Sequence, residues 1–200
     1  VFPMLVLYIL FFIFPLFQTI GYSFTDYNGI NPRKEFTGLT NYVDVFQDKW
    51  FYNSMLFTGK SVILMILLAN VLGFLLALAL NTKIKSRNIL RAIVFCPFVF
   101  NNVTVGFIWQ FLLGRFMTDL YPLTGWKVFN IGWLSDSSLV LYSVVFVKLW
   151  QSIGYFMVIY LAGLQLLPQD PLEAAVLDGC TGIKMIRYIT IPLMKPTAFV

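Results

Sequence analysis

Residues 61–81 read SVILMILLANVLGFLLALALN and contain no charged side chain. An α-helix needs about 20 mostly apolar residues to cross the roughly 30 Å hydrocarbon core of a bilayer. The apolar run extends back to Tyr52, so we predict a membrane span over 52–81. Lipid offers no hydrogen-bond partners, so the backbone N–H and C=O groups of a span must bond to one another within the protein. A β-barrel would show short segments of alternating hydrophobicity, whereas this apolar run is continuous. The span is therefore predicted to be a helix.

The whole chain has the same apolar character. Of its 200 residues, 59% are hydrophobic, 18% are aromatic and only 12% are charged, and the mean hydropathy is +0.80. Soluble domains carry about 25% charged residues, so the chain has half the usual supply. This composition argues against a soluble enzyme, a disordered tail and a disulfide scaffold. The chain also has no histidine, the usual general base and metal ligand.

The rest of the chain divides into further apolar segments and polar connections. Additional spans are predicted over three ranges: 1–25, 92–113 and 139–164. Loops are predicted at 26–50 and 114–138, where polar residues, Gly and Pro gather. The last residues, 197–200, are expected to begin a fifth span that the sequence truncates. The predicted fold is thus an all-α polytopic membrane protein with four spans and the start of a fifth.

Basic residues predict the orientation. The connection 82–91 holds Lys83, Lys85, Arg87 and Arg91 and no acid. Such clusters stay on the cytoplasmic side, so alternation places 26–50 and 114–138 outside and 165–196 inside. The net charge of +5 is then explained by the membrane surface, and no nucleic-acid partner is expected. Cys96 and Cys180 fall in segments assigned to different compartments, so no disulfide is predicted.

The predicted cytoplasmic segment has its own internal pattern, LQLLPQDPLEAAVLDGCTGIKMIRYITIP from Leu164 to Pro192. Pro168 discourages continuation of the fourth span. Asp170 as N-cap, Pro171 at the first position and Glu173 three residues after the cap predict the start of a short helix. One face of that helix would carry Leu172, Ala175 and Val176.

Gly179 is placed to end this helix, and a second short helix is predicted over 182–190, before Pro192. Such a helix pair suits docking into a groove on a partner. An ordinary interfacial helix pair would have the same pattern, so the residues alone leave both interpretations open.

Other features of the spans have simpler explanations. Ala69, Gly73 and Ala77 form a small-residue stripe, which we interpret as helix packing within this chain. Gly59-Lys60-Ser61 resembles the end of a phosphate-binding loop, but Ser54 stands where the first glycine is required and no strand precedes it. The chain itself is therefore predicted to bind no ATP.

Polar residues inside the spans are candidates for a translocation path. A charge within a membrane costs several kcal/mol and tends to face a cavity or a partner. Lys148 lies nine residues into the fourth span, and Gln151 and Tyr155 follow on the same helical face. Snorkelling of Lys148, or its pairing with another subunit, would be alternatives. Asn101 and Asn102 in the third span are further candidates, either for the path or for contacts between helices.

The cytoplasmic segment resembles a known family. Glu173-Ala174-Ala175, then Gly179, Ile189 and Ile191-Pro192 have the spacing of the EAA loop of ABC importer permeases. Ile191 replaces the usual leucine, which is a conservative apolar change. Further segments resemble the maltose and glycerol-phosphate type of permease in the same order along the chain: 36–42, 106–109, 133–136, 149–151 and 161–165.

The resemblance implies a type I ABC importer transmembrane domain. Residues 1–51 would hold an N-terminal span and external loop, and 52–200 an incomplete type-1 domain of a six-span family, with the coupling loop at 165–196. The coupling residues would be Glu173, Ala174, Ala175, Asp178 and Gly179, with no bond chemistry and no metal. Glu173 would also serve as a helix-start acid.

The resemblance also implies partners and a location. Separate cytoplasmic ATPase subunits would bind ATP and Mg²⁺, and a non-identical second permease would complete the path. An extracellular or periplasmic solute-binding protein would deliver a carbohydrate or polyol to the permease, which would lie in a bacterial or archaeal inner membrane. A secondary transporter or channel would not need the spaced motif, and a membrane-embedded enzyme would need catalytic groups that the spans do not assemble.

Overall fold

A computed structural model describes residues 2–30, 34–82 and 84–195 of the chain. These residues are mostly helical, as the composition predicts, and their only β interaction is an isolated antiparallel bridge between Thr25 and Phe36. The chain forms two compact units, one up to Thr58 and one from Gly59 onward. The predicted fifth span at 197–200 lies outside the described residues.

The first unit begins with a continuous helical segment. It consists of α1 (Phe2–Tyr8), a π-helical stretch η1 (Ile9–Ile13) and α2 (Phe14–Ser23). Together they are long and apolar enough to cross a membrane. The predicted first span, 1–25, is thus helical over Phe2–Ser23 and qualifies as a span by its length and composition.

The segment 26–50, predicted as a loop, contains helical structure. A helix α3 (Thr40–Gln47) forms inside it, and α4 (Lys49–Leu80) begins before the predicted start at Tyr52. The side chain of Asp48 explains the early start, because its Oδ1 accepts a hydrogen bond of 2.8 Å from the backbone N–H of Trp50. Such a cap satisfies a donor that the first helical turn leaves free.

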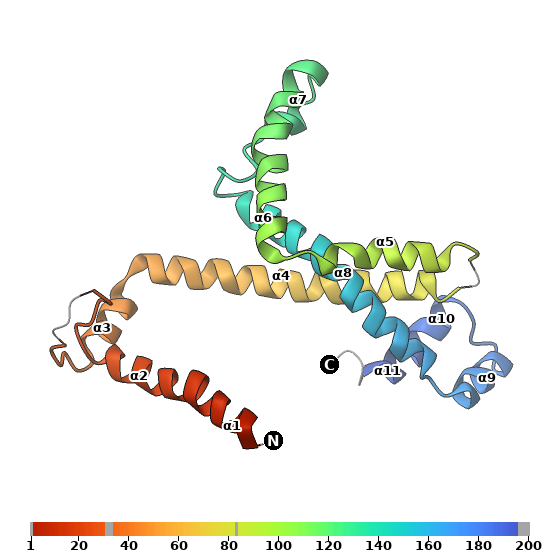
Figure 1. The fold of residues 1–200 in the computed structure, drawn as a ribbon. Coiled ribbons are helices and arrows are strands. Elements are labelled where there is room, and N and C mark those ends of the chain that lie inside the picture. Colours follow the sequence, from red (N-terminus) through yellow and green to blue (C-terminus); the bar gives the residue numbers. More distant parts are fainter. Residues whose placement is uncertain (1, 31–33, 83, 196–200) are drawn as a thin grey trace. The chain divides into compact units, whose positions relative to one another are not determined.

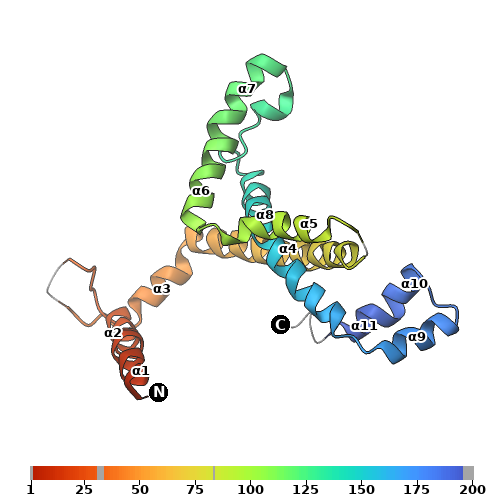
Figure 2. The same ribbon diagram turned by 45° about the vertical axis from the view of Figure 1, so that its right-hand side comes forward.

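The predicted third span is broken. Helix α5 (Arg87–Val99) ends before Phe100, and the helical segment that starts at Asn102 leaves at an angle of 94° (Figures 1 and 2). Phe100 and Asn101 are extended, and the Asn101 side chain accepts a hydrogen bond of 2.9 Å from the N–H of Val103. Pro97 near the end of α5 also weakens the helix there. The expectation of one helix over 92–113 was wrong.

The helix after the break extends into the predicted loop 114–138. It comprises α6 (Asn102–Gln110), the π-helical η2 (Phe111–Phe116) and α7 (Met117–Thr124), and it ends at Gly125, whose φ of 69° is left-handed. A 3₁₀ turn η3 (Lys127–Asn130) follows. The prediction of a loop was thus wrong up to Thr124. Gly114 and the charged residues Arg115 and Asp119 suggested a loop, but all three lie on the exposed surface of the helix.

Helix α8 (Val140–Gln165) is the predicted fourth span and packs against both α4 and α5. A Cβ on Gly73 of α4 would lie 2.7 Å from Cβ of Phe156, and one on Gly154 of α8 would lie 2.3 Å from the carbonyl oxygen of Val94. Glycine at these points lets the helices approach closely. Ala69 and Ala77 are fully buried, so the small-residue stripe packs within the chain as predicted.

The core of the second unit joins the spans to the C-terminal helices. Its buried residues come from α4, α8 and the segment after Leu193: Ala77, Leu80, Met157, Tyr160, Leu161, Leu164 and Met194. Three helices in the described part of the chain qualify as spans, and the bent pair would make a fourth. Both cysteines, Cys96 and Cys180, are free thiols in the structure.

Candidate functional site

Two short helices follow α8 directly. Helix α9 (Gln169–Leu177) begins after Pro168, which has an extended backbone with φ −62° and ψ 138° and serves as the N-cap. The prediction that Asp170 caps this helix was wrong, because Pro168 turns the chain earlier and places Asp170 in the first turn. In that turn its carboxylate interacts favourably with the positive end of the helix dipole.

The end of α9 has the geometry that the sequence predicts. Gly179 has a φ of 77°, a left-handed conformation that glycine adopts without strain. Its N–H donates to the carbonyl of Val176 at 3.0 Å, and the N–H of Cys180 donates to the carbonyl of Ala175 at 2.8 Å. This pair of bonds is a Schellman motif, which satisfies carbonyls at the helix end.

The second helix is longer than predicted. After Gly182 the chain forms α10 (Ile183–Met185), a π-helical η4 (Ile186–Thr190) and α11 (Ile191–Leu193) without a break. Pro192 therefore lies inside helical structure, not after it. The π-helical turn before it changes the i→i−4 pattern that proline would otherwise obstruct.

A groove of about 470 Å³ opens beside Glu173. Its lining comes from α9 and from α10: Gln169, Leu172, Glu173, Val176, Leu177 and Met185. Ala175 is buried, whereas Ala174 and Asp178 are exposed. Of the five residues that the resemblance assigns to coupling, Glu173 lies on the groove and Gly179 shapes the turn below it.

A second, polar cavity of about 450 Å³ lies at the break between α5 and α6. Four of the five predicted path residues line it: Asn101, Asn102, Lys148 and Gln151. The fifth, Tyr155, does not line the cavity and stacks on Phe98, with ring centroids 4.9 Å apart. The break thus brings together polar groups, the Phe100 carbonyl among them, that are 46 to 51 positions apart in the sequence.

Hydrogen bonds fix the polar groups of this cavity. Nζ of Lys148 donates to Oδ1 of Asn102 at 3.2 Å. Nε2 of the buried Gln151 donates at 3.1 Å to the carbonyl of Phe100, which the break leaves without a helical partner. Lys148 itself is exposed to the cavity. The arrangement can offer donors and acceptors to a polar solute.

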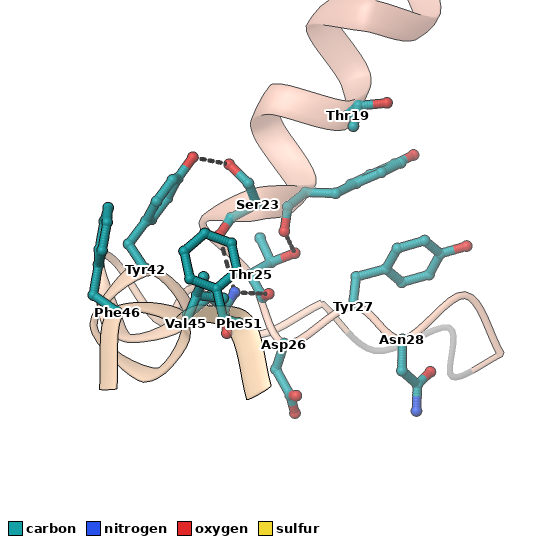
Figure 3. A pocket seen from close by; sticks show the side chains of 12 residues that line it. Thr19, Ser23, Thr25, Asp26, Tyr27, Asn28, Tyr42, Val45, Phe46 and Phe51 are labelled. Atoms are coloured by element: carbon teal, nitrogen blue, oxygen red, sulfur yellow. Dashed lines mark hydrogen bonds between the residues drawn. The ribbon is translucent and has the colours of Figure 1, made fainter. Parts of the chain in front are cut away.

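A third pocket, of about 660 Å³, lies in the first unit (Figure 3). Apart from Val45 its walls are aromatic and polar. The lining residues lie at and after the end of α2, on α3 and at the start of α4: Thr19, Tyr22, Ser23, Thr25, Asp26, Tyr27, Asn28, Asn41, Tyr42, Val45, Phe46 and Phe51. Nδ2 of Asn41 donates to the carbonyls of Ser23 and Thr25, both at 2.9 Å, and Tyr42 is hydrogen-bonded to Ser23. The segment 36–42 therefore fastens α3 to the end of α2.

Sequence reasoning missed part of each lining. Ser152 follows Lys148 by one helical turn, and Leu177 follows Glu173 by one turn, so the helical period was a usable signal for both. Met185 and Phe98 gave no such signal, because their positions depend on a turn and on a packed neighbour.

Comparison with known proteins places the chain in a family. The family model described as "Binding-protein-dependent transport system inner membrane component" matches residues 69–200. The chain is 36% identical over 196 residues to the probable starch degradation products transport system permease protein AmyD of Thermoanaerobacterium thermosulfurigenes, covering 97% of this chain and 66% of that protein. It is 30% identical over 203 residues to the trehalose/maltose transport system permease protein MalF of Thermococcus litoralis, covering 99% and 68%.

A solved structure has the same fold. The crystal structure of a bacterial ABC transporter involved in the import of the acidic polysaccharide alginate superposes with a TM-score of 0.78 at 22% identity, covering 98% of this chain and 66% of that one. The chain spans about two thirds of the length of the relatives it matches. The family match confirms the resemblance seen in residues 173–192, and the chain belongs to the family of binding-protein-dependent transport system inner membrane components.

Proposed function

We propose that the chain is part of a permease subunit of an ATP-driven importer for a carbohydrate or related polyol. It would form the translocation path, while separate cytoplasmic subunits bind and hydrolyse ATP and an external binding protein delivers the solute. Family membership supports this role, as do relatives named as sugar transport permeases. The chain would lie in a bacterial or archaeal inner membrane with a second, non-identical permease.

The helical hairpin beyond α8 is the observation that carries the proposal. The Schellman turn at Gly179 folds Ile183–Leu193 back beside α9, and the groove with Glu173 on its wall faces outward between them. An exposed groove with an apolar floor and an acidic wall suits a helix or loop from a partner. Glu173, Ala174, Ala175, Asp178 and Gly179 would dock the ATPase without bond chemistry.

The hairpin is also joined to the spans. Met194, just after α11, belongs to the same buried cluster as Leu164 of α8 and Leu80 of α4. Displacement of the hairpin by ATPase closure would therefore be passed to α8, whose central turns line the polar cavity. Such a transporter is a two-state element biased by ligands on both sides.

The polar cavity would form part of the solute path. Asn101, Asn102, Lys148 and Gln151 supply donors and acceptors there, and Met65 and Phe98 supply an apolar wall. Tyr155 would act through Phe98 and not by touching the solute. No nucleotide site is proposed for this chain, because Gly59-Lys60-Ser61 lies within helix α4 and cannot form a phosphate loop.

Replacing Glu173 by arginine tests the coupling role. Charge reversal on the groove wall is expected to abolish co-purification of the ATPase and ATP-dependent uptake, while the permease remains in the membrane. Asp170→Arg is the matched control, since Asp170 is an exposed acid on the same helix but does not line the groove. If Glu173→Arg leaves ATPase association and ATP-dependent uptake intact, the coupling role of Glu173 is wrong. Uptake by the unchanged protein without any associated ATPase would instead indicate a channel or secondary transporter.

A further inference from the structure

The polar cavity at the α5–α6 break is lined by a positive charge and by no negative charge among the described residues. It contains one ammonium group, Lys148, together with the amides of Asn101, Asn102 and Gln151 and the hydroxyl of Ser152. Among the residues that the structure describes, no carboxylate lines it.

The neighbouring helices cannot supply a counter-ion. The sequence has no Asp or Glu between Asp48 and Asp119, or between Asp136 and Asp170. Helices α4, α5, α6 and α8 therefore contain no acid at all. The one salt bridge in the described part of the chain joins Arg115 to Asp119, both exposed.

The hydrogen bonds leave most of the ammonium unsatisfied by protein. Lys148 has three N–H donors, and its one partner among the described residues is the neutral amide oxygen of Asn102. The nearby carbonyl of Phe100 accepts from Gln151, and the hydroxyl of Ser152 donates to the backbone carbonyl of Lys148. Both groups are thus held by other bonds.

A charge within a membrane span is expensive and is retained where it meets a partner or a substrate. We infer that Lys148 gives the cavity a positive potential that repels cationic solutes and favours a polyhydroxylated solute carrying a carboxylate or phosphate group. The amides would bind hydroxyls, and the wall of Met65, Phe98 and Phe100 would contact the apolar face of the solute. This inference rests on the proposed function, because it assigns the solute class of that path.

The potential can be measured with thiol reagents of opposite charge. The reporter is Ser152→Cys in a permease with Cys96→Ser and Cys180→Ser, studied as the full-length subunit in its assembled transporter. Rates of modification by an anionic sulfonatoethyl and a cationic trimethylammonium-ethyl methanethiosulfonate give an anion-to-cation ratio. A neutral methyl methanethiosulfonate reports whether the thiol remains accessible.

Lys148→Gln is expected to lower this ratio on the order of tenfold or more, the effect of one unit charge about one helical turn away in a water-filled site. Lys148→Arg keeps the charge and should keep the ratio. The neutral reagent should react at similar rates in all three. Thr181→Cys, in the exposed turn after α9, should show no response to Lys148→Gln.

An unchanged ratio in Lys148→Gln would overturn the inference, and would mean that an acid from another subunit neutralises Lys148. The ratio does not depend on ATPase docking, so this failure is distinct from failure of the Glu173 experiment. Uptake by the intact system of maltose, digalacturonate and glycerol phosphate provides the second readout. Lys148→Gln should reduce uptake of one or both anions more than that of maltose, and an equal effect on all three would contradict the inference.

Discussion

Gly179 holds a backbone conformation that other residues adopt at a cost. Its φ is 77°, and no atom lies within 4 Å of the position that a Cβ would occupy, so a substitution meets strain but no clash. Gly179→Ala is expected to destabilise the turn by about 1–2 kcal/mol, and Gly179→Asn by less. Thermal unfolding and amide protection at Cys180 would measure this.

Gly59→Ala is the control for that substitution. Gly59 lies within α4 and is also free of neighbours, but its backbone is helical, so alanine should be tolerated or stabilising. Equal losses of amide protection at Cys180 in both variants would contradict a role for the left-handed backbone.

Asp136 makes the start of α8 sensitive to acid. Ser138 donates its hydroxyl to Oδ1 of Asp136 at 2.7 Å and its backbone N–H to the same oxygen at 2.8 Å. These bonds lower the pKa of the Asp136 carboxyl below its ordinary value of 3.8. The stabilisation is therefore complete above that ordinary value and is lost as the pH falls through the lowered pKa.

We expect the protection factor of the Ser138 amide to fall over this acidic range. Hydrogen exchange, corrected for the intrinsic pH dependence of the rate, measures it. In Asp136→Asn the side chain no longer titrates, so the acid-dependent loss should disappear. The same loss in both proteins would contradict the assignment.

The sequence predicted some residue roles better than others. The role of Gly179 was predictable because a glycine directly after an apolar helical face commonly ends the helix in a left-handed conformation. The N-cap was missed because Asp170-Pro171 has the composition of a helix start, whereas in the structure Pro168 is the N-cap and the helix begins at Gln169. Composition does not distinguish these two starting points, and the backbone conformation of Pro168 decides between them.

At the scale of elements, close backbone contact joins α8 to α5. A Cβ on Gly154 would lie 2.3 Å from the Val94 oxygen and 2.6 Å from the Phe95 Cα. These are backbone atoms that no rotamer change can move. Gly154→Ala is therefore expected to destabilise the second unit by at least the 1–3 kcal/mol typical of overpacking.

Thermal unfolding in detergent would measure this loss, with Gly106→Ala as the matched control. Gly106 lies in α6 with nothing within 4 Å of its would-be Cβ. A Gly154→Ala protein as stable as the control would show that α5 and α8 can separate without penalty.

Helices were predicted well where a long apolar run is enough to identify them. The spans at 1–25, 52–81 and 139–164 are helices within a few residues of their predicted bounds. The break at Phe100 and Asn101 was missed because an uncharged run conceals it, although Pro97 and two asparagines were visible. Helix α3 was missed because its polar surface has the composition of a loop.

At the scale of the whole molecule, the orientation is a prediction open to labelling. Single cysteines at Ile30 and Leu123 should react with an impermeant maleimide in intact cells, whereas cysteines at Ser86 and Thr181 should react only after permeabilisation. All four positions are exposed, and the background would carry Cys96→Ser and Cys180→Ser. Labelling of Thr181→Cys in intact cells would contradict a cytoplasmic hairpin.

Assembly of the sites required tertiary structure. The sequence nominated Lys148 and Asn102 separately, from polarity within apolar runs. Their contact spans 46 positions and depends on the 94° bend, and the direction of that bend cannot be read from the sequence of either span. The groove beside Glu173 was closer to prediction, because its lining except Met185 lies on one short helix.

The two glycine contacts of α8 have a mechanical consequence. Gly154 brings α8 against the backbone of α5, and Gly73 brings α4 against the backbone of α8 at Phe156 and Met157. With main chain touching main chain on both sides, α8 has no compliant layer of side chains in which to slide or twist. A push at its Gln165 end should therefore rotate all three helices together as one stiff lever.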